Sequence, residues 1–468
     1  MEILRRSPMF GILISIISAM ALYDKFNIYA FIVGVPLIFS GIMLCSYEEN
    51  LPEQWKVFCV ALIFAFLSGL QIYNVISKPD PEDFSFTNED GIVTLVRTWG
   101  KTYASIIETE HYGKFVVRTH FADFTEGAKI KFDGSTKKFR PKSKNSDFDE
   151  GRYWKARGVK SWVSIKNVKE NDDKKFSFYG LRYKISKFLT IHTPKLTGEY
   201  LKAAWLGEHT KELDEKHRKW GTSHLLAVSG FHVGIVILCV SLIFGNNFFV
   251  MSLILWLYII LTGAAPSAMR AGLMLQIGIL TKILGRRING INSVSSAAVI
   301  LLLFRPFLFW DIGFRLSVLT ALTITSLSFW DKKILLSLIS SIIFFVTFPQ
   351  VSYTFKGVPI AGILLNIFAP VYFSFAFLIA SVIVFFKIIN FPFSDLFLYP
   401  VEGIFLLWEK IADFVANIIP YIASWNYFTA WTGTGILIFV ICRYFNFSFL
   451  KTIILMIAMS FAAFVIFL

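Results

Sequence analysis

Apolar and polar residues are unevenly distributed along the chain: long apolar blocks run from one end to the other, and one polar region separates them. Many blocks are about 20 residues long, which lets a helix cross about 30 Å of hydrocarbon. The pattern predicts a polytopic α-helical membrane protein. The blocks expected to form membrane helices are residues 8–23, 28–45, 56–76, 224–244, 248–264, 268–285, 291–309, 312–329, 333–348, 358–388, 399–420, 429–444 and 449–468.

The polar region at residues 79–170 has a different period. Alternating apolar and polar residues, bounded by Gly, Asp and Asn, predict the strands of a small antiparallel sheet. Five such runs occur: GIVTLVRTWG, YASIIET, KFVVRTHF, AKIKFDG and KSWVSIKNV. Five short strands fit an inserted OB-like barrel, a fold that often binds oligonucleotides. A fold alone does not establish a function, so this is a weak indication.

Residues 171–222 contain apolar positions at helical spacing. In LRYKISKFL the basic residues Arg182, Lys184 and Lys187 lie opposite the apolar side, which is typical of a helix at a membrane interface. The following stretch, LTGEYLKAAWLGEHTKELDEKHRKWG, predicts a helix that ends at Gly207 and then a second, highly charged helix.

The composition agrees with a membrane protein, because 55% of the residues are hydrophobic and only 17% are charged, against about a quarter in soluble domains. Lys and Arg outnumber Asp and Glu by 46 to 32, a formal net charge of +14. We assign about half of this excess to cytoplasmic loops. The four cysteines show no C-x-x-C spacing, so we predict neither a metal cluster nor a disulfide framework.

The basic residues also predict an orientation. If Arg5 and Arg6 keep the N-terminus in the cytoplasm, three crossings place residues 79–222 outside. The pairs Arg286–Arg287 and Lys332–Lys333 then fall inside, where the positive-inside rule requires them.

Two points of the topology stay open. Ala19–Ala21, near the end of the first block, resembles a signal-peptidase site, but we favour an uncleaved membrane helix. After Pro349 the number of crossings is undetermined, because the block at 358–388 is interrupted at Pro370 and fits two half-helices or a re-entrant turn.

The second half of the polar region is strongly basic. Residues 137–169 contain eleven Lys and Arg but only three acids, with aromatic residues between them. Cations that meet phosphates and rings that stack on bases suit a single nucleic-acid strand, and a solvated basic loop near anionic lipid headgroups is an equal alternative. The candidate DNA-binding residues are Arg140, Lys142, Lys144, Arg152, Tyr153, Trp154, Lys155 and Arg157.

Polar groups inside apolar blocks cost free energy unless they face protein or water. The stretch SHLLAVSGFHVG, residues 223–234, contains several of them. On an ideal helix His224 and His232 lie about 80° apart, on adjoining parts of one face. Ser229 and Gly230 between them allow a helix break or the close approach of a neighbour.

Two further clusters follow. In TGAAPSAMRAG a helix restarts at Pro266, and Arg270 lies one turn inside it. In FWDIGFRLS the residues Asp311 and Arg315 are four apart on one face, as an ion pair or as two separate pore groups.

Each cluster also has a purely structural interpretation. His224 suits a membrane interface, Ser229–Gly230 suits helix packing, and Arg270 suits a side chain that extends to the interface. Asp311 and Arg315 suit a structural ion pair. A metal site on His224 and His232 is disfavoured, because no H-E-x-x-H string accompanies them.

Taken together, these stretches resemble the ComEC competence family of bacterial inner-membrane channel proteins for DNA uptake. GTSHLLAVSGFHVGIV is similar to its central signature, and LTGAAPSAMRAGLM and GRRINGINSVSSAAVILLLFRPFLFWDIGFRLSVL are similar to its next two blocks. SDFDEGRYWKARGV is similar to the end of the family's external OB-like domain, although the usual Pro-Gly is missing here. The resemblance covers residues from about 25 to about 385.

The resemblance implies that the protein translocates single-stranded DNA into the cytoplasm, from a multi-pass position in the bacterial cytoplasmic membrane. It puts His224, Ser229, Gly230, His232, Arg270, Asp311 and Arg315 in the channel. The expected organisation is N-terminal membrane helices in 1–78, an extracytoplasmic OB-like domain in 79–170, interfacial helices in 171–222, a ComEC-type channel core in 223–390 and C-terminal membrane helices in 391–468.

We expect neither an enzyme nor a cofactor. Many family members carry a C-terminal metallo-β-lactamase-like domain, but this sequence has no H-x-H-x-D-H string, and it has no G-x-x-x-x-G-K-[ST] string for ATP. The implied partners are therefore an external DNA-receptor protein, a cytosolic helicase-like ATPase and a separate nuclease, with a homo-oligomer as a further possibility.

Two other functions remain open from the sequence. One is a membrane-embedded metal-dependent hydrolase built on His224 and His232. The other is a transporter of a different polar substrate, such as a small solute or a lipid-linked molecule, on the same fold.

Overall fold

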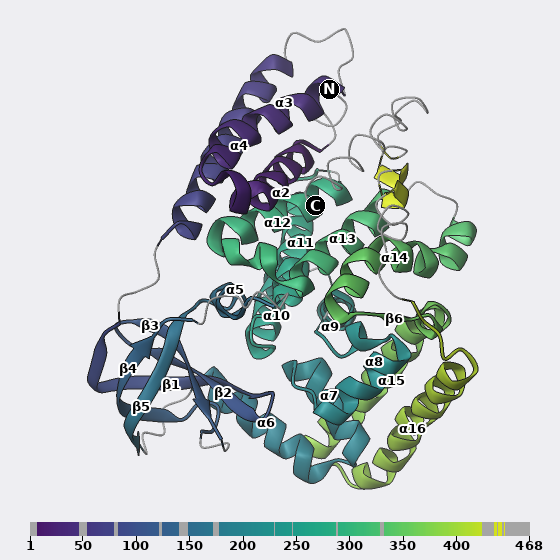
Figure 1. Cartoon of the computed structure of the whole chain (residues 1–468). Coiled ribbons are helices and arrows are strands. Elements are labelled where there is room, and N and C mark those ends of the chain that lie inside the picture. The colour runs from purple at the N-terminus through teal and green to yellow at the C-terminus, as the bar shows by residue number, and fades with distance from the viewer. Residues whose placement is uncertain are drawn as a thin grey trace. The chain divides into compact units, whose positions relative to one another are not determined.

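The structure, a computed structural model, describes residues 7–45, 54–78, 83–120, 124–139, 148–171, 177–228, 230–245, 247–286, 289–327, 332–423, 435–437, 439–441 and 444 (Figure 1). The chain divides into two compact units. The first unit takes its residues from Met1–Lys78, Arg270–Ile367 and Ile419–Leu468, and the second from Pro79–Met269 and Phe368–Ile418. One division falls at the predicted boundary after residue 78, whereas two others lie inside the segment predicted as a single core, 223–390.

The first unit is a helical bundle. Its elements are α2 (Pro8–Phe26), the π-turn η1 (Ala30–Gly34), α3 (Val35–Cys45), α4 (Gln54–Ile76), most of α11 (Pro266–Ile283), α12 (Gly290–Phe304), η3 (Pro306–Trp310), α13 (Ile312–Ser326), α14 (Lys332–Phe355) and the short strands β6 (Val358–Pro359) and β7 (Ile422–Ala423). Helix α2 packs against α3, α4 and α12. The Ser7 hydroxyl donates to Asn289 Oδ1 at 3.2 Å, and the Met9 amide donates to Asn292 Oδ1 at 3.1 Å. These bonds tie the start of α2 to the start of α12.

The second unit holds the remaining helices. They are α5 (Glu150–Ala156), α6 (Phe178–His192), α7 (Lys195–Leu206), α8 (Lys211–Trp220), the 3-10 turn η2 (Ser223–Leu225), α9 (Gly230–Phe244), α10 (Phe248–Leu261), most of α15 (Ala361–Ile388) and α16 (Ser394–Ile418). Helix α7 ends where the sequence predicts, because Gly207 adopts a left-handed conformation (φ 68°) and its N–H bonds back to the last turn.

Within the part of the chain that the structure describes, three helices are long and apolar enough to cross a membrane: Pro8–Phe26, Val57–Ile76 and Ala361–Ile388. The last corrects an expectation. The block at 358–388 is neither broken at Pro370 nor re-entrant, since α15 continues through the proline. Proline removes one backbone donor from a helix, and the carbonyl oxygen of Pro370 accepts a bond of 2.7 Å from the Ser374 hydroxyl. Apolar blocks 429–444 and 449–468 lie almost wholly outside the described residues.

The polar region folds as a small barrel, which confirms the predicted all-β insert. Its strands are β1 (Ser85–Trp99), β2 (Thr102–Thr109), β3 (Gly113–Thr119), β4 (Lys129–Lys137) and β5 (Val159–Asn171), closed in the order β1-β2-β3-β5-β4 (Figure 1). Only the β3–β5 pair is parallel. The alternating residues that predicted the strands form the barrel core, among them Val93, Ile107, Phe115, Ile130 and Phe132.

Helix α6 joins the barrel to the helices of the second unit. A Cβ on Gly127, in the loop before β4, would lie 2.3 Å from the backbone nitrogen of Gly180 in α6, so the two chains touch through glycines. Arg182, two residues further along α6, is 2% exposed. The expectation that Arg182 lies on the outer face with Lys184 and Lys187 is therefore wrong, while both lysines are exposed as expected.

Arg182 binds acceptors from three parts of the unit. Its Nη2 donates to the carbonyl oxygen of Leu206 at 3.0 Å and lies 3.6 Å from Glu208 Oε1 and 3.9 Å from Glu126 Oε2. The backbone of Gly263 crosses so closely that a Cβ there would lie 2.5 Å from Nη1. Burial raises the pKa of the Glu126 carboxyl, although Arg182 opposes that rise. The guanidinium thus connects the barrel, the end of α7 and the loop after α10.

We expect Arg182→Met to lower the free energy of unfolding by about 3–5 kcal/mol, because it leaves the buried carboxylate of Glu126 and the half-buried carboxylate of Glu208 without their cation. Lys184→Met, a neighbour exposed on the same helix, is the matched control and should change the value by no more than about 0.5 kcal/mol. Denaturant unfolding of the detergent-solubilised full chain measures both. Equal losses for the two variants would contradict the role given to Arg182.

Candidate functional site

The polar motif at residues 223–234 does not form one helix. Ser223–Leu225 is a 3-10 turn, and α9 begins only at Gly230. The prediction that His224 and His232 share adjoining parts of one helix face is therefore wrong, because no continuous helix connects them. His224 is exposed and Gly230 is half-buried, whereas His232 is 4% exposed. Ser229 lies outside the described residues.

His232 packs against an aromatic cluster, which we define as Tyr200, Phe373, Phe377 and Phe405. The ring centroids of His232 and Phe377 are 5.1 Å apart, and Phe377 lies 5.2 Å from Phe373. Tyr200 of α7 stacks on Phe405 of α16 at 4.5 Å with an interplanar angle of 12°. Such ring pairs add specific packing energy to the burial of apolar surface. The cluster therefore joins α7, α9, α15 and α16 around the histidine.

A second buried histidine precedes the motif. His217, in the last turn of α8, is fully buried. Its Nε2 lies 2.9 Å from the Tyr200 hydroxyl, and its Nδ1 lies 2.9 Å from the Thr222 hydroxyl and 3.4 Å from the Thr222 carbonyl oxygen. Helix α8 ends at Gly221 with φ 72°, and the amide of Thr222 returns a bond of 2.9 Å to the His217 carbonyl. His217 thus holds the chain where it enters the motif.

The partners of His217 decide which nitrogen carries the proton. A carbonyl oxygen only accepts, so Nδ1–H donates toward Thr222, and Nε2 accepts from the Tyr200 hydroxyl. Burial lowers the pKa of His217 to about 3, against the weaker opposing effect of the bond to Thr222. The lowered pKa keeps the imidazole neutral near pH 7.

Helices α7 and α8 are held to α16 by an acidic stripe, which we define as Glu402, Glu409 and Asp413. Glu402 accepts from the amides of Leu196 and Thr197 at 3.0 and 2.7 Å, at the start of α7. A carboxylate there neutralises the unpaired N–H groups and the positive end of the helix.

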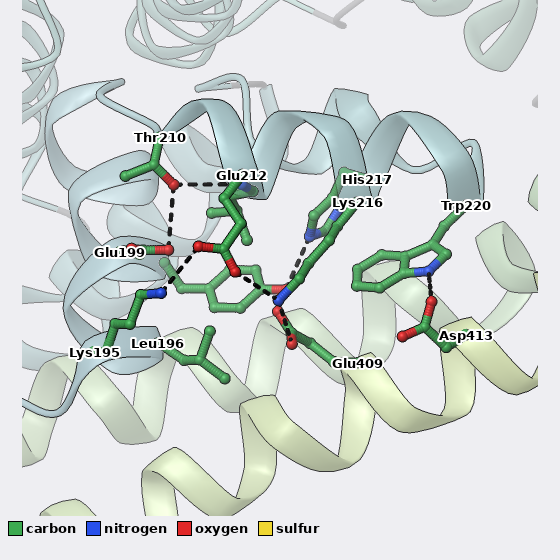
Figure 2. Close-up of polar contacts among 12 residues, drawn as sticks. Lys195, Leu196, Glu199, Thr210, Glu212, Lys216, His217, Trp220, Glu409 and Asp413 are labelled. Atoms are coloured by element: carbon green, nitrogen blue, oxygen red, sulfur yellow. Dashed lines mark hydrogen bonds and ion pairs between the residues drawn. The ribbon is translucent and has the colours of Figure 1, made fainter.

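The other two carboxylates of the acidic stripe bind α8. Lys216 Nζ lies 2.9 Å from Glu409, and the indole N–H of Trp220 donates to Asp413 at 2.9 Å. Figure 2 shows Lys216 and Trp220 pointing from α8 toward these carboxylates of α16. The stripe thus fixes the helix that leads into the motif.

The other predicted channel residues lie in the first unit. Arg270 is 7% exposed, and its Nε donates to the Ser317 hydroxyl at 2.7 Å. Asp311 is the N-cap of α13, where its Oδ1 accepts from the amide of Phe314 at 3.0 Å. Arg315 is half-buried in the first turn of the same helix. The capping role of Asp311 was missed, although an acid just before an apolar run signals it.

The candidate DNA-binding residues that the structure describes lie on α5 of the barrel or at its C-cap. Arg152, Tyr153 and Lys155 are half-buried, and the Arg157 guanidinium lies 3.6 Å from the centroid of the Tyr153 ring. Arg97 on β1 donates to the Tyr153 hydroxyl at 3.0 Å. Arg140, Lys142 and Lys144 lie outside the described residues.

Trp154 corrects the expectation of an exposed aromatic. It is fully buried in the barrel core, because on α5 it faces the opposite side from its basic neighbours. The sequence analysis missed Trp99 and Phe148, whose rings lie 5.1 and 5.5 Å from Tyr153. Phe148 is 49% exposed. The available rings on this face are therefore Trp99, Phe148 and Tyr153.

Within the ranges that the structure describes, no group of three or more His, Cys, Asp or Glu side chains is placed to hold a metal ion.

Comparison with known proteins adds a family. Residues 206–450 match the family model described as "Competence protein". The protein named ComE operon protein 3 of Bacillus subtilis (strain 168) is 29% identical over 237 residues, which are 47% of this chain and 30% of that protein. The chain therefore matches less than a third of the relative's length. No solved structure matches it.

The low pKa of His217 predicts sensitivity to acid. Between pH 6.5, the ordinary histidine pKa, and about pH 3, the unfolded chain binds a proton that the folded chain excludes. The free energy of unfolding therefore decreases as the pH is lowered, by up to about 1.4 kcal/mol per pH unit. We expect His217→Gln to lose about 1–3 kcal/mol at pH 7.5 and to show a shallower further loss down to pH 5. Thermal unfolding between pH 7.5 and pH 5 tests this prediction, and the exposed His120→Gln is the control. If the melting temperatures of wild type and His217→Gln fell in parallel with pH, the prediction would be refuted.

Proposed function

Since the chain belongs to the competence protein family, we propose that it is a channel that translocates single-stranded DNA into the cytoplasm during natural transformation. The observation that carries the proposal is the family match over residues 206–450, because this span contains all three polar clusters found inside apolar sequence.

The chemistry of the clusters supports a polar passage. A polyanion cannot enter hydrocarbon, so it needs a path lined by water, by polar groups and by fixed positive charge. We propose that His224, Ser229, Gly230 and His232 of the second unit line this path. Arg270, Asp311 and Arg315 of the first unit are proposed to line it as well.

The barrel supports a capture step before entry. We propose that it is an OB-like module whose α5 face binds the strand through Arg152, Lys155 and Arg157, while Phe148 and Tyr153 stack on bases. Aromatic faces accept any base and cations bind any phosphate, which suits uptake without sequence preference. Arg140, Lys142 and Lys144 belong to the same proposal.

We further propose a bacterial cytoplasmic-membrane location, with the N-terminus inside and residues 79–222 outside. The three candidate spans and the positive-inside rule support it. The proposed role is that of a channel and not of an enzyme. It therefore requires an external DNA-receptor protein, a helicase-like ATPase that pulls from the cytosol, a separate nuclease and, in one form, further copies of this chain.

The capture step is tested with the purified full chain in detergent and a fluorescent oligothymidylate. We expect Lys155→Gln/Arg157→Gln to weaken binding and to reduce the slope of log K against log salt by about 1.4, at about 0.7 per lost phosphate contact. The double variant Lys184→Gln/Lys187→Gln removes the same charge from the exposed side of α6 and should leave the slope unchanged. A slope equal to wild type in both would contradict capture by α5.

Translocation is tested in the cell that carries the gene, provided that it is competent. Deletion should abolish transformation by added DNA while DNA still binds to the cell surface, and a plasmid copy should restore it. Unchanged transformation after deletion would instead favour transport of another polar substrate.

A further inference from the structure

Arg270 is a buried cation with no acidic partner among the residues that the structure describes. In α11 its Nε donates to the Ser317 hydroxyl of α13 at 2.7 Å, and its Nη1 lies 3.1 Å from the sulfur of Met274. The side chain is 7% exposed. Among the residues that the structure describes, no carboxylate forms an ion pair with this guanidinium.

The comparison with Arg182 shows how unusual this is. Arg182 is 2% exposed and lies within 4 Å of both Glu126 and Glu208. A buried charge without such compensation costs several kcal/mol, and inside apolar helices such a residue marks a functional site by default. Of these two buried arginines, Arg182 therefore has carboxylate partners among the described residues and Arg270 has none.

The donors left over at Arg270 define the missing ligand. A guanidinium has five N–H groups; one binds Ser317 and one meets a thioether, which is a weak acceptor. The two N–H groups of Nη2 have no acceptor among the described residues. Because Ser317 accepts from Nε, its own O–H also remains available to donate. Several donors and a positive charge in one place require an anionic oxygen ligand.

The position of Arg270 adds to the attraction for an anion. It lies near the start of α11 (Pro266–Ile283), where the helix dipole is positive. Arg315 does not belong to this site, since residues 315 and 317 point about 200° apart around α13. The site therefore consists of Arg270 and Ser317.

We propose that Arg270 and Ser317 form an oxyanion site that binds a backbone phosphate of the translocated strand; this rests on the proposed function. The planar fork of arginine matches the two non-bridging oxygens of a phosphodiester better than a point charge does. Phosphate contacts carry no sequence information, so every strand meets the same site. Ser317 fixes the guanidinium plane through Nε.

The test uses the full chain in a maltoside detergent free of phospholipid, and its key variant is Arg270→Met. Replacing an uncompensated buried charge by an apolar side chain is often neutral or stabilising. We therefore expect the ligand-free variant to melt at or above the wild-type temperature, whereas inorganic phosphate raises the melting temperature of wild type only. A structural arginine would instead give a variant that melts lower.

Oligothymidylate binding to the same samples identifies the source of the phosphate. We expect Arg270→Met to bind about tenfold more weakly and with a salt slope smaller by about 0.7. Arg270→Lys should retain part of the affinity, and Ser317→Ala should lose part of it. Lys282→Gln, which removes an exposed charge from the other end of α11, is the matched control and should behave as wild type.

The outcomes separate the two proposals. If Arg270→Met binds the oligonucleotide as wild type does, the phosphate site is wrong. If anionic phosphatidylglycerol stabilises wild type but neither inorganic phosphate nor oligonucleotide does, the ligand is a lipid headgroup, and the assignment to the strand is overturned. If phosphate stabilises only proteins that retain Arg270 but no variant binds DNA, the oxyanion site stands and the DNA channel fails.

Discussion

A group that leaves water must find a partner inside the protein, and this constraint determines how the second unit is held together. Two buried polar residues bind other elements of the unit: Arg182 binds the barrel and the end of α7, and His217 binds Tyr200 and Thr222. Glu402 meets the N-terminus of α7 in the same way. Each such contact fixes the relative position of two elements more specifically than apolar packing does. The polar motif after residue 222 therefore follows a segment that is held in place by hydrogen bonds.

The sequence predicts the elements well because their causes are local. A block of about 20 apolar residues needs a helix to satisfy its backbone in hydrocarbon. Helices α2 and α4 form as expected, and α15 forms without the predicted break at Pro370. Alternation of period two places every second residue in a barrel core, which explains why β1 to β5 were found. Gly207 ends α7 since only a left-handed residue closes that turn.

The candidate site is less predictable, because its contacts span distances that no local pattern encodes. Arg182 and Trp154 looked exposed among basic neighbours, yet each faces a layer contributed by other segments. The segment that leads into the helix break between His224 and His232 is held by His217, which is not part of the motif. The contacts of α16 with α7 and α8 could not be predicted from the sequence either, although Glu402 and Glu409, seven residues apart, lie on one helix face. A sequence shows that such residues are polar, whereas only the fold shows what they bind.

The acidic stripe on α16 has a consequence for the order in which the chain is made. Glu402 and the amide it binds at the start of α7 are 205 positions apart. At ordinary rates of translation the ribosome needs about 10–40 s to cover that distance. Throughout this interval α7 and α8 exist without the carboxylates that bind them, while the ribosome already synthesises α9 to α15. A nascent chain released before residue 402 therefore lacks the carboxylates that bind the first amides of α7 and the Lys216 and Trp220 side chains of α8.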